Sequence, residues 1–321
     1  MKNAPVKISA AANVALIKYW GKTDLEKNIP AVASLSIGIE DLRTETIISE
    51  SKDKTDTLVG RFKKYEKKRI LNYVSMAKKL LGVSGGLKIE TANNFPSSSG
   101  LASSASGFAA IALGIDEFFA LDLPRKDISR LARLGSGSAA RSIYGGFVQM
   151  DTGTDPFAAP LKLEDPWLLD ILVLVTEEQP KKLSSTDSMN LTKGTSPFYS
   201  AWLDTQENDF LRAKDAIIER DFWKLARISE HNCLKMHSTI MTANPPHIYW
   251  NPTTVKILHQ VQKIQEKGLQ VFFTIDAGPQ VKLICDPSDT QLILEQFESM
   301  HDISKKIVTK VGGEPRIERL T

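Results

Sequence analysis

The chain has 321 residues, of which 42% are hydrophobic and 25% charged, with 19 glycines and 15 prolines. This composition is typical of a folded globular protein with one large domain or two packed lobes, and it argues against collagen-like, coiled-coil and disordered classes. The net charge of +3 is small for a dedicated nucleic-acid binder, and two cysteines are too few for a disulfide framework or a four-ligand zinc site. No apolar stretch is long enough for a membrane span and no export signal is recognisable, so we expect a cytoplasmic protein.

The first third of the chain alternates strand and helix patterns. Residues 6–14 and 42–50 alternate apolar and polar side chains, which predicts strands of a sheet with one solvated face. The lysine-rich run 64–81 predicts a helix that stops at Gly82, and residues 87–91 predict a further strand.

A tract of small residues, 97–107 (SSSGLASSASG), follows. Such tracts are often flexible linkers. This one runs directly into an apolar helical face that begins at Phe108, so we expect it to open a buried helix. A short helix over 128–134 then leads into a second small-residue turn, 135–142 (GSGSAARS), and an apolar strand.

The second half predicts a buried strand over 169–176 and helices over about 198–233 and 253–267. Strands are expected over 269–276, 281–285 and 307–311. No internal repeat is evident, and the pattern predicts an α+β chain whose two lobes meet near residues 175–185.

The turn before the first buried helix has the composition of a phosphate-binding site. Glycine and serine let backbone N–H groups approach an anion, and a helix N-terminus adds partial positive charge. The tract is neither a P-loop nor a dinucleotide-binding fingerprint. From the residues alone, an anion site and a merely small-residue helix start are equally good interpretations.

Several charged residues have both a structural and a functional interpretation. Lys18 and Lys22 flank aromatic residues and either extend from an apolar core or supply point charges to a phosphate or carboxylate. Arg141 is either a surface residue or a bidentate carboxylate ligand. Asp276 ends an apolar run before a Gly-Pro turn, so it either caps that turn or acts as a general base.

Other chemistries find little support. His231, His237 and His247 share no metal-ligand spacing with Cys233, and the nucleophile elbow of serine hydrolases is absent. The basic run 63–69 is interpreted as a solvated helix face, with a nucleic-acid module as the alternative from a different class.

Together, the motifs resemble one known family. These are ALIKYWGK (15–22), NNFPSSSGLASSASGFAA (93–110), GSGSAARSIYGGF (135–147), SSTDSMNLT (184–192) and FTIDAGPQVKL (273–283). Their order and spacing are similar to those of the diphosphomevalonate decarboxylases of the GHMP kinase superfamily. The resemblance implies an α+β, GHMP kinase-like two-lobed fold. Residues 1–180 would form an N-terminal ribosomal-protein-S5-like α/β lobe with an ATP phosphate loop. Residues 181–321 would form a C-terminal ferredoxin-like α+β lobe that carries the catalytic aspartate.

The resemblance also implies an activity, the ATP- and Mg²⁺-dependent decarboxylation of (R)-5-diphosphomevalonate to isopentenyl diphosphate, ADP, phosphate and CO₂ in the mevalonate pathway of isoprenoid biosynthesis. Asp276 would be the general base or orienter of the 3-hydroxyl, and Lys18 would pair with it. Arg141 would hold the departing carboxylate. Family members are usually homodimers that act on small molecules, with no nucleic-acid or membrane partner.

The remaining site residues implied by the resemblance form two groups. Around the substrate it implies Tyr19, Trp20, Gly21, Lys22, Arg69, Ser136, Gly137, Ser138, Ala139, Ala140, Arg141, Ser185, Thr186 and Met189. Around ATP it implies Asn94, Pro96, Ser97, Ser98, Ser99, Gly100, Leu101, Ala102, Ser103 and Ser104, with Mg²⁺ held by the ATP phosphates and Ser104.

The sequence departs from the family pattern at two positions, with Ser188 where many members have glycine and Ala140 where many have cysteine. These small replacements bear on substrate preference more than on reaction type. Phosphomevalonate decarboxylase and mevalonate 3-kinase activities therefore stay open as alternatives, as does a non-catalytic nucleotide or nucleic-acid binder.

Overall fold

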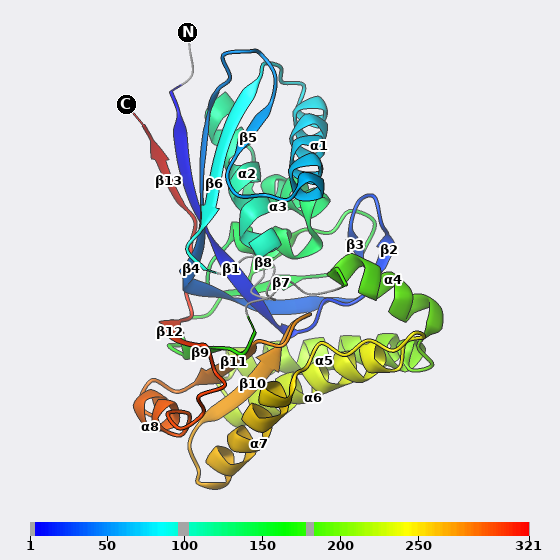
Figure 1. Cartoon of the computed structure of the whole chain (residues 1–321), viewed down its shortest axis with the longest axis vertical. Helices are drawn as coiled ribbons and strands as arrows, with labels where there is room; N and C mark the ends of the chain where they lie inside the picture. Colours follow the sequence, from blue (N-terminus) through cyan, green and yellow to red (C-terminus); the bar gives the residue numbers. More distant parts are fainter. Residues whose placement is uncertain (1–3, 96–102, 178–182, 321) are drawn as a thin grey trace.

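The computed structural model describes residues 4–95, 103–177 and 183–320, which form two stacked lobes (Figure 1). The upper lobe is built on a sheet of order β13-β1-β4-β6-β5, with β7 and β8 attached to β4. Its strands are β1 (Val6–Ile17), β4 (Ser34–Glu50), β5 (Thr57–Val59), β6 (Leu87–Asn93), β7 (Phe147–Met150), β8 (Ala158–Pro160) and β13 (Arg316–Arg319). The short hairpin of β2 (Lys22–Asp24) and β3 (Ile29–Pro30) lies to one side.

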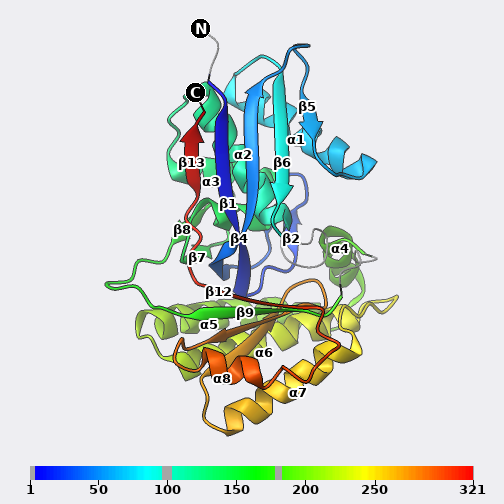
Figure 2. The same cartoon turned by 60° about the vertical axis from the view of Figure 1, so that its left-hand side comes forward.

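Helices cover one face of the upper sheet (Figure 2). They are α1 (Lys64–Leu81), α2 (Ser103–Phe119), α3 (Arg125–Gly135) and the 3₁₀ helix η1 (Gly137–Ile143). The expected stop of α1 at Gly82 is confirmed, because Gly82 adopts the left-handed conformation that terminates helices. Helix α2 lies so close to the sheet that a Cβ on Gly114 would be 2.6 Å from Ile48 Cδ1. Residues 103–107 of the small-residue tract therefore open a buried helix, as predicted; residues 97–102 lie outside the described chain.

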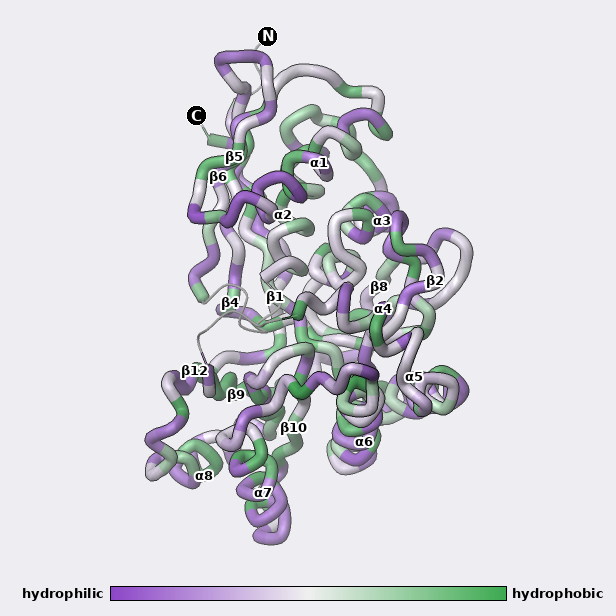
Figure 3. Tube along the Cα trace, turned by 45° about the vertical axis from the view of Figure 1, so that its right-hand side comes forward, coloured by the Kyte–Doolittle hydropathy of each residue, from purple (hydrophilic) through white to green (hydrophobic). Residues whose placement is uncertain are grey.

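The lower lobe holds a four-stranded sheet of order β10-β11-β9-β12. Its strands are β9 (Asp170–Val175), β10 (Val271–Ile275), β11 (Val281–Cys285) and β12 (Lys305–Lys310), and its helices are α4 (Ser185–Thr195), α5 (Tyr199–Ile218), α6 (Phe222–Met241), α7 (Pro252–Glu266) and α8 (Thr290–Glu295). Helices α7 and α8 pack on one face of this sheet, and α5 and α6 pack on the other. The end of α7 is hydrophilic (Figure 3), and residues 266–268 there are exposed.

The single helical stretch expected over 198–233 is instead two helices. Helix α5 ends at Ile218, and Arg220 has a positive φ of 54° that a continuous helix does not allow. Asp221 then begins α6 by accepting a hydrogen bond from the backbone N–H of Lys224 at 2.9 Å. The apolar periodicity runs through both helices, so it does not reveal the turn between them.

The strand pairing does not follow a single division of the chain at residue 180. Strand β9 lies before that position but is the central neighbour of β11 and β12 in the lower sheet. Strand β13 lies near the end of the sequence but pairs antiparallel with β1 in the upper sheet. The chain therefore crosses between the lobes twice, after β8 and after β12.

One hydrophobic cluster joins the lobes. It contains Leu16 and Ile37 from the upper sheet, Val173 and Phe272 from the lower sheet, and Phe210 from α5, all of them buried. Burial of apolar surface is the dominant favourable contribution to folding, so this shared cluster fixes the ends of β1 and β10 relative to each other. Among the described residues, no helix is long and apolar enough to cross a membrane.

Candidate active site

The site lies where the ends of two strands from different lobes meet. Strand β1 ends just before Lys18, and β10 ends just before Asp276. The Nζ atom of Lys18 lies 2.7 Å from Oδ1 of Asp276 and also donates to the carbonyl oxygen of Ala15 at 2.8 Å. Thr274 Oγ1 on β10 donates to the same carbonyl at 3.0 Å. These contacts hold the two strand ends together and bring the expected base and its lysine partner into contact.

The Asp276 carboxyl is kept ionised by surrounding cations. Burial alone would raise the pKa of Asp276, but Lys18, Lys282 and Arg141 outweigh burial and hold it below its usual value. The Lys18 side chain is only 1% exposed, whereas that of Asp276 is 24% exposed. The carboxylate is therefore charged, fixed from behind by lysine and open on one side.

Lys282 is a second buried lysine beside this carboxylate, and sequence reasoning missed it. Its Nζ lies 3.9 Å from Oδ2 of Asp276. Burial lowers the pKa of Lys282 to about 8, and Asp276 offsets part of that effect. The available signal was a single lysine within the otherwise apolar strand VKLIC (281–285).

Helix α6 holds the backbone that carries Asp276. His237 Nε2 lies 3.2 Å from the carbonyl oxygen of Ile275, which can only accept, so this nitrogen carries the proton. Burial and nearby Lys18 lower the pKa of His237 to about 3, which keeps the ring neutral. Cys233 Sγ accepts from the backbone N–H of Ile275 at 3.2 Å. Within the described parts of the chain, neither side chain belongs to a group that could hold a metal ion; both contact the backbone at the end of β10.

Arg141 is buried in η1 and is held by neutral oxygens of the upper sheet. Its Nη1 and Nε donate to Ser34 Oγ at 2.7 Å and Ser36 Oγ at 3.0 Å, and its Nη2 lies 3.5 Å from Asn13 Oδ1. Burial lowers the pKa of Arg141 to about 10, while Asp276 acts to raise it. The guanidinium stays charged at neutral pH. Its hydrogen-bond partners within the described chain are neutral oxygens, so no carboxylate pairs directly with its charge.

Two further cations lie beside one another on the upper lobe. Lys22 Nζ bonds Asn28 Oδ1 at 2.6 Å and Thr186 Oγ1 at 3.1 Å. Burial and the charge of Arg69 lower the pKa of Lys22 to about 8, with Asp187 acting to raise it. Arg69 donates to the Gly135 carbonyl at 2.7 Å. Mutual repulsion between cations is relieved when an anion binds between them, which favours an anionic ligand here.

Tyr19 lies beside Arg141, and its hydroxyl donates to the carbonyl oxygen of Asn28. The Arg141 guanidinium lies 5.9 Å from the centre of the Tyr19 ring. Burial raises the pKa of Tyr19, so its hydroxyl stays protonated. A Cβ on Gly137 would lie 2.2 Å from the Tyr19 hydroxyl, so only glycine allows η1 to approach the ring this closely.

A row of serines connects η1 to the start of α2. Ser104 Oγ lies 3.4 Å from Ser136 Oγ, which in turn lies 3.3 Å from Ser138 Oγ. Helix α2 has no acidic residue in its first turn. The partial positive charge at the start of α2 and these hydroxyls therefore lie next to each other, and no carboxylate in the first turn of the helix would repel an anion there.

Other residues implied by the resemblance lie in an apolar cluster, at a tight backbone turn or at a helix start. Trp20 and Met189 lie in an apolar cluster with Trp202, whose Nε1 donates to the Trp20 carbonyl at 3.0 Å. Gly21 has a φ of 105° and no room for a side chain beside Tyr199. Two small residues of η1, Ala139 and Ala140, are fully buried, and Ser185 opens α4.

The expected ATP loop is only partly within the described chain. Pro96, Ser97, Ser98, Ser99, Gly100, Leu101 and Ala102 lie outside the described residues. Asn94, just before them, is bound to β4 through both ends of its amide: Oδ1 accepts from the Arg43 backbone N–H at 2.9 Å, and Nδ2 donates to the Asp41 carbonyl at 2.8 Å. Asn94 therefore fixes the chain where the loop begins.

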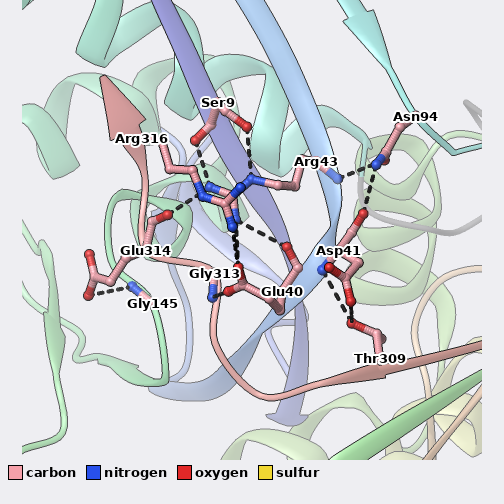
Figure 4. Close-up of polar contacts among 10 residues, drawn as sticks. All are labelled: Ser9, Glu40, Asp41, Arg43, Asn94, Gly145, Thr309, Gly313, Glu314 and Arg316. Atoms are coloured by element: carbon pink, nitrogen blue, oxygen red, sulfur yellow. Dashed lines mark hydrogen bonds and ion pairs between the residues drawn. The ribbon is translucent and has the colours of Figure 1, made fainter. Parts of the chain in front are cut away.

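This contact belongs to a polar network that joins the lobes (Figure 4). The Arg43 guanidinium donates to Ser9 and to the carbonyl of Glu314, in the segment that leads to β13. Thr309 of β12 donates to Asp41 Oδ2 at 2.8 Å. The start of the loop is thus connected through β4 to the lower sheet.

No group of three or more histidine, cysteine, aspartate or glutamate side chains that could hold a metal ion occurs among the described residues. Ser104, in the first turn of α2, would supply a hydroxyl oxygen to a divalent cation held by the phosphates of a bound ligand.

Family models match both lobes. Residues 10–159 match the diphosphomevalonate decarboxylase-like N-terminal domain, and residues 171–319 match the mevalonate 5-diphosphate decarboxylase C-terminal domain. The chain is 32% identical to the diphosphomevalonate decarboxylase of Candida albicans over 89% of this chain and 86% of the relative. It is also 32% identical to the human enzyme of that name over 86% of this chain and 75% of the relative.

Solved structures agree with the sequence matches. The mevalonate diphosphate decarboxylase of Staphylococcus aureus superposes with a TM-score of 0.92 at 34% identity, covering 98% of both chains. A structure described as MDDEF in complex with MVAPP, AMPPCP and magnesium superposes with a TM-score of 0.89 at 35% identity, covering 99% of both. These matches confirm the expected α+β, two-lobed GHMP kinase fold, and the chain belongs to the diphosphomevalonate decarboxylase family.

Proposed function

We propose that this protein catalyses the ATP-dependent decarboxylation of (R)-5-diphosphomevalonate to isopentenyl diphosphate, ADP, phosphate and CO₂, in the mevalonate pathway of isoprenoid biosynthesis. The observation that carries the proposal is one ionised carboxylate, Asp276, among the cations Lys18, Lys282 and Arg141. The excess of positive charge suits a substrate with a carboxylate and a diphosphate, and the carboxylate suits its hydroxyl group. Family relatives carry this activity in their names, and one structural neighbour is described as a complex with MVAPP, AMPPCP and magnesium.

Asp276 and Lys18 would activate the tertiary 3-hydroxyl. Asp276 accepts the hydroxyl proton as the oxygen attacks the γ-phosphorus of ATP and ADP leaves. A carboxylate whose pKa lies below its usual value is a weak base, so the proton moves only as the new O–P bond withdraws charge from the oxygen. Lys18 stabilises the negative charge shared by base and phosphate.

Arg141 would then align the bond that breaks. The phosphate leaves C3 with the C–O electron pair, and the electrons of the bond to the carboxylate form the new double bond as CO₂ departs. A guanidinium fixed by Ser34 and Ser36 can hold the carboxylate so that these two bonds lie in line. Lys22 and Arg69 would bind the diphosphate of the same substrate, because an anion relieves the repulsion between these two cations.

The start of α2 would bind the ATP phosphates, with Ser103 and Ser104 of its first turn next to the predicted loop. Mg²⁺, when bound through the phosphates, would neutralise charge that develops during transfer. In this arrangement residues 1–180 supply the phosphate-binding elements, and residues 181–321 supply Asp276. We also propose that the protein is a homodimer in the cytoplasm. A sedimentation mass twice that of one chain would support the dimer, and the mass of one chain would contradict it.

The substrate assay separates the proposal from its nearest alternatives. Purified protein is supplied with ATP, Mg²⁺ and either mevalonate, 5-phosphomevalonate or 5-diphosphomevalonate, while ADP and CO₂ are measured. ADP and CO₂ in equal amounts from the diphosphate alone support the proposal. Release of CO₂ from the monophosphate would identify a phosphomevalonate decarboxylase, and ADP from mevalonate without CO₂ would identify a 3-kinase.

A further inference from the structure

We propose that Lys282 is a positioning residue for Asp276: its ammonium group fixes Oδ2 of the carboxylate, so that the carboxylate stays ionised and turned toward the substrate hydroxyl. This inference rests on the proposed function, since it assigns Asp276 the role of proton acceptor. It adds a residue to which the resemblance gave no part.

The strand register places Lys282 in an apolar layer. Lys282 pairs with Thr274 on β10 and with Val173 on β9, so these side chains share one face of the lower sheet. On the same face lie Phe272 and Ile284, which belong to the cluster that joins the lobes. A lysine that is 1% exposed in such a layer is costly unless an anion compensates it. The carboxylate of Asp276 is that anion, at 3.9 Å.

The two lysines act on different oxygens of one carboxylate. Lys18 contacts Oδ1 from the upper lobe, and Lys282 faces Oδ2 from the lower sheet. The last torsion of an aspartate side chain has a broad energy profile and is not fixed by rotamer preference alone. Cations on both oxygens restrict this rotation, while the exposed side of the carboxylate keeps lone pairs for a ligand.

The effect of Lys282 on the pKa of Asp276 should appear in the pH dependence of the reaction, because the other buried groups nearby keep a fixed charge. The groups that face the pair from neighbouring elements are Cys233 and His237 on α6 and Arg141 on η1. Burial raises the pKa of the Cys233 thiol and lowers that of His237 to about 3, so both are neutral near pH 7. The charge on Asp276 is therefore balanced by Lys18, Lys282 and Arg141, and removal of Lys282 raises the pKa of Asp276.

The test compares Lys282→Met with Lys282→Arg and with a packing control, Ile284→Met, which places methionine on the same face of the same strand. We expect Lys282→Met to lower kcat about 10- to 100-fold, the scale expected for a misplaced catalytic group, with the KM for ATP changed less than about 2-fold. The acid limb of its kcat–pH profile should move to higher pH. Lys282→Arg should keep the acid limb of the wild type, and Ile284→Met should keep kcat within about 2-fold.

Thermal melts and nucleotide binding show whether each variant is folded. The proposal is overturned if the acid limb of Lys282→Met stays where it is in the wild type, or if Ile284→Met loses as much activity as Lys282→Met. An acid limb for Lys282→Arg that matches Lys282→Met would also overturn it. Failure of the proposed function is a separate result, because it appears as absent CO₂ release by the wild-type protein.

Discussion

The Nζ of Lys18 lies 2.7 Å from Oδ1 of Asp276, although 258 positions separate the two residues in the sequence. Each residue directly follows a strand, and the strands belong to different lobes. The relative placement of the lobes therefore determines the geometry of this ion pair. Substitutions in the cluster between the lobes that shift this placement should lower turnover even where they touch no substrate, whereas volume-conserving ones such as Ile284→Met should not.

Replacing Asp276 by asparagine tests the proton acceptor. The amide keeps the shape of the side chain but cannot accept the proton, so we expect kcat to fall by about 10²- to 10⁴-fold. ATP binding should change little, because the proposed phosphate contacts come from the start of α2 and not from Asp276. Steady-state ADP release and nucleotide titration measure the two quantities, and near-normal product formation would contradict the assigned role.

Replacing Arg141 by lysine tests the planar donor group. Lysine retains the charge but cannot donate to Ser34 and Ser36 in the same fork geometry while also facing a carboxylate. We expect kcat/KM for the diphosphate substrate to fall at least about 100-fold, with the KM for ATP nearly unchanged. A variant with wild-type kcat/KM would show that only the charge matters.

The KM for the anionic substrate should rise as the pH passes above about 8. The pKa of Lys22 is lowered to about 8, so the free enzyme loses this cation in that range, whereas below it Lys22 is protonated and attracts the diphosphate. Lys22→Arg should remove this rise, because arginine stays charged throughout the range. Initial-rate measurements from pH 6.5 to about 9.5 check this, and an equal rise in KM for both proteins would assign the titration to another group.

Asn94→Ala should raise the KM for ATP about 3- to 10-fold without lowering kcat at saturating ATP. The substitution removes two hydrogen bonds that fix the chain before the phosphate loop, each worth about 0.5–1.5 kcal/mol. Thr309→Val is the matched control, because it removes contacts with Asp41 in the same network but none with Asn94. Equal KM values for the two variants would show that the network acts only on stability.

Gly137→Ala should lower kcat/KM at least about 10-fold, because the new methyl group would displace Tyr19 from beside Arg141. Gly194→Ala in α4 is the control. Its Cβ would meet nothing within 4 Å, and alanine favours the helix by about 0.8–1.0 kcal/mol. Melting temperatures and kinetics of both variants check the pair. Unchanged kinetics in Gly137→Ala would show that the position of Tyr19 is not critical.

Local patterns predicted much of this fold. The helix 64–81 with its glycine stop and the strand 281–285 occur where the sequence places them. The break at Arg220 was not predictable, because apolar periodicity continues across it. Strand β13 was also missed, since its sequence RIER is exposed and mostly charged, and its support comes from distant residues: pairing with β1 and ion pairs with Glu40 and Glu117.

The site was predictable where its chemistry is concentrated in short motifs. KYWGK and DAGP each contain an unusual combination of residues, and the structure brings Lys18 and Asp276 together. Lys282 and His237 were not predictable, because their effect on Asp276 depends on strand register and on the packing of α6. Ser34 and Ser36, which hold Arg141, look like ordinary strand residues in the sequence.

The pairing of β13 with β1 has a consequence for biosynthesis. During translation the upper lobe emerges from the ribosome first, but the outer edge of β1 stays unpaired until residues 316–319 have also emerged. An exposed strand edge can pair with other chains, so the nascent protein is prone to aggregation during this interval.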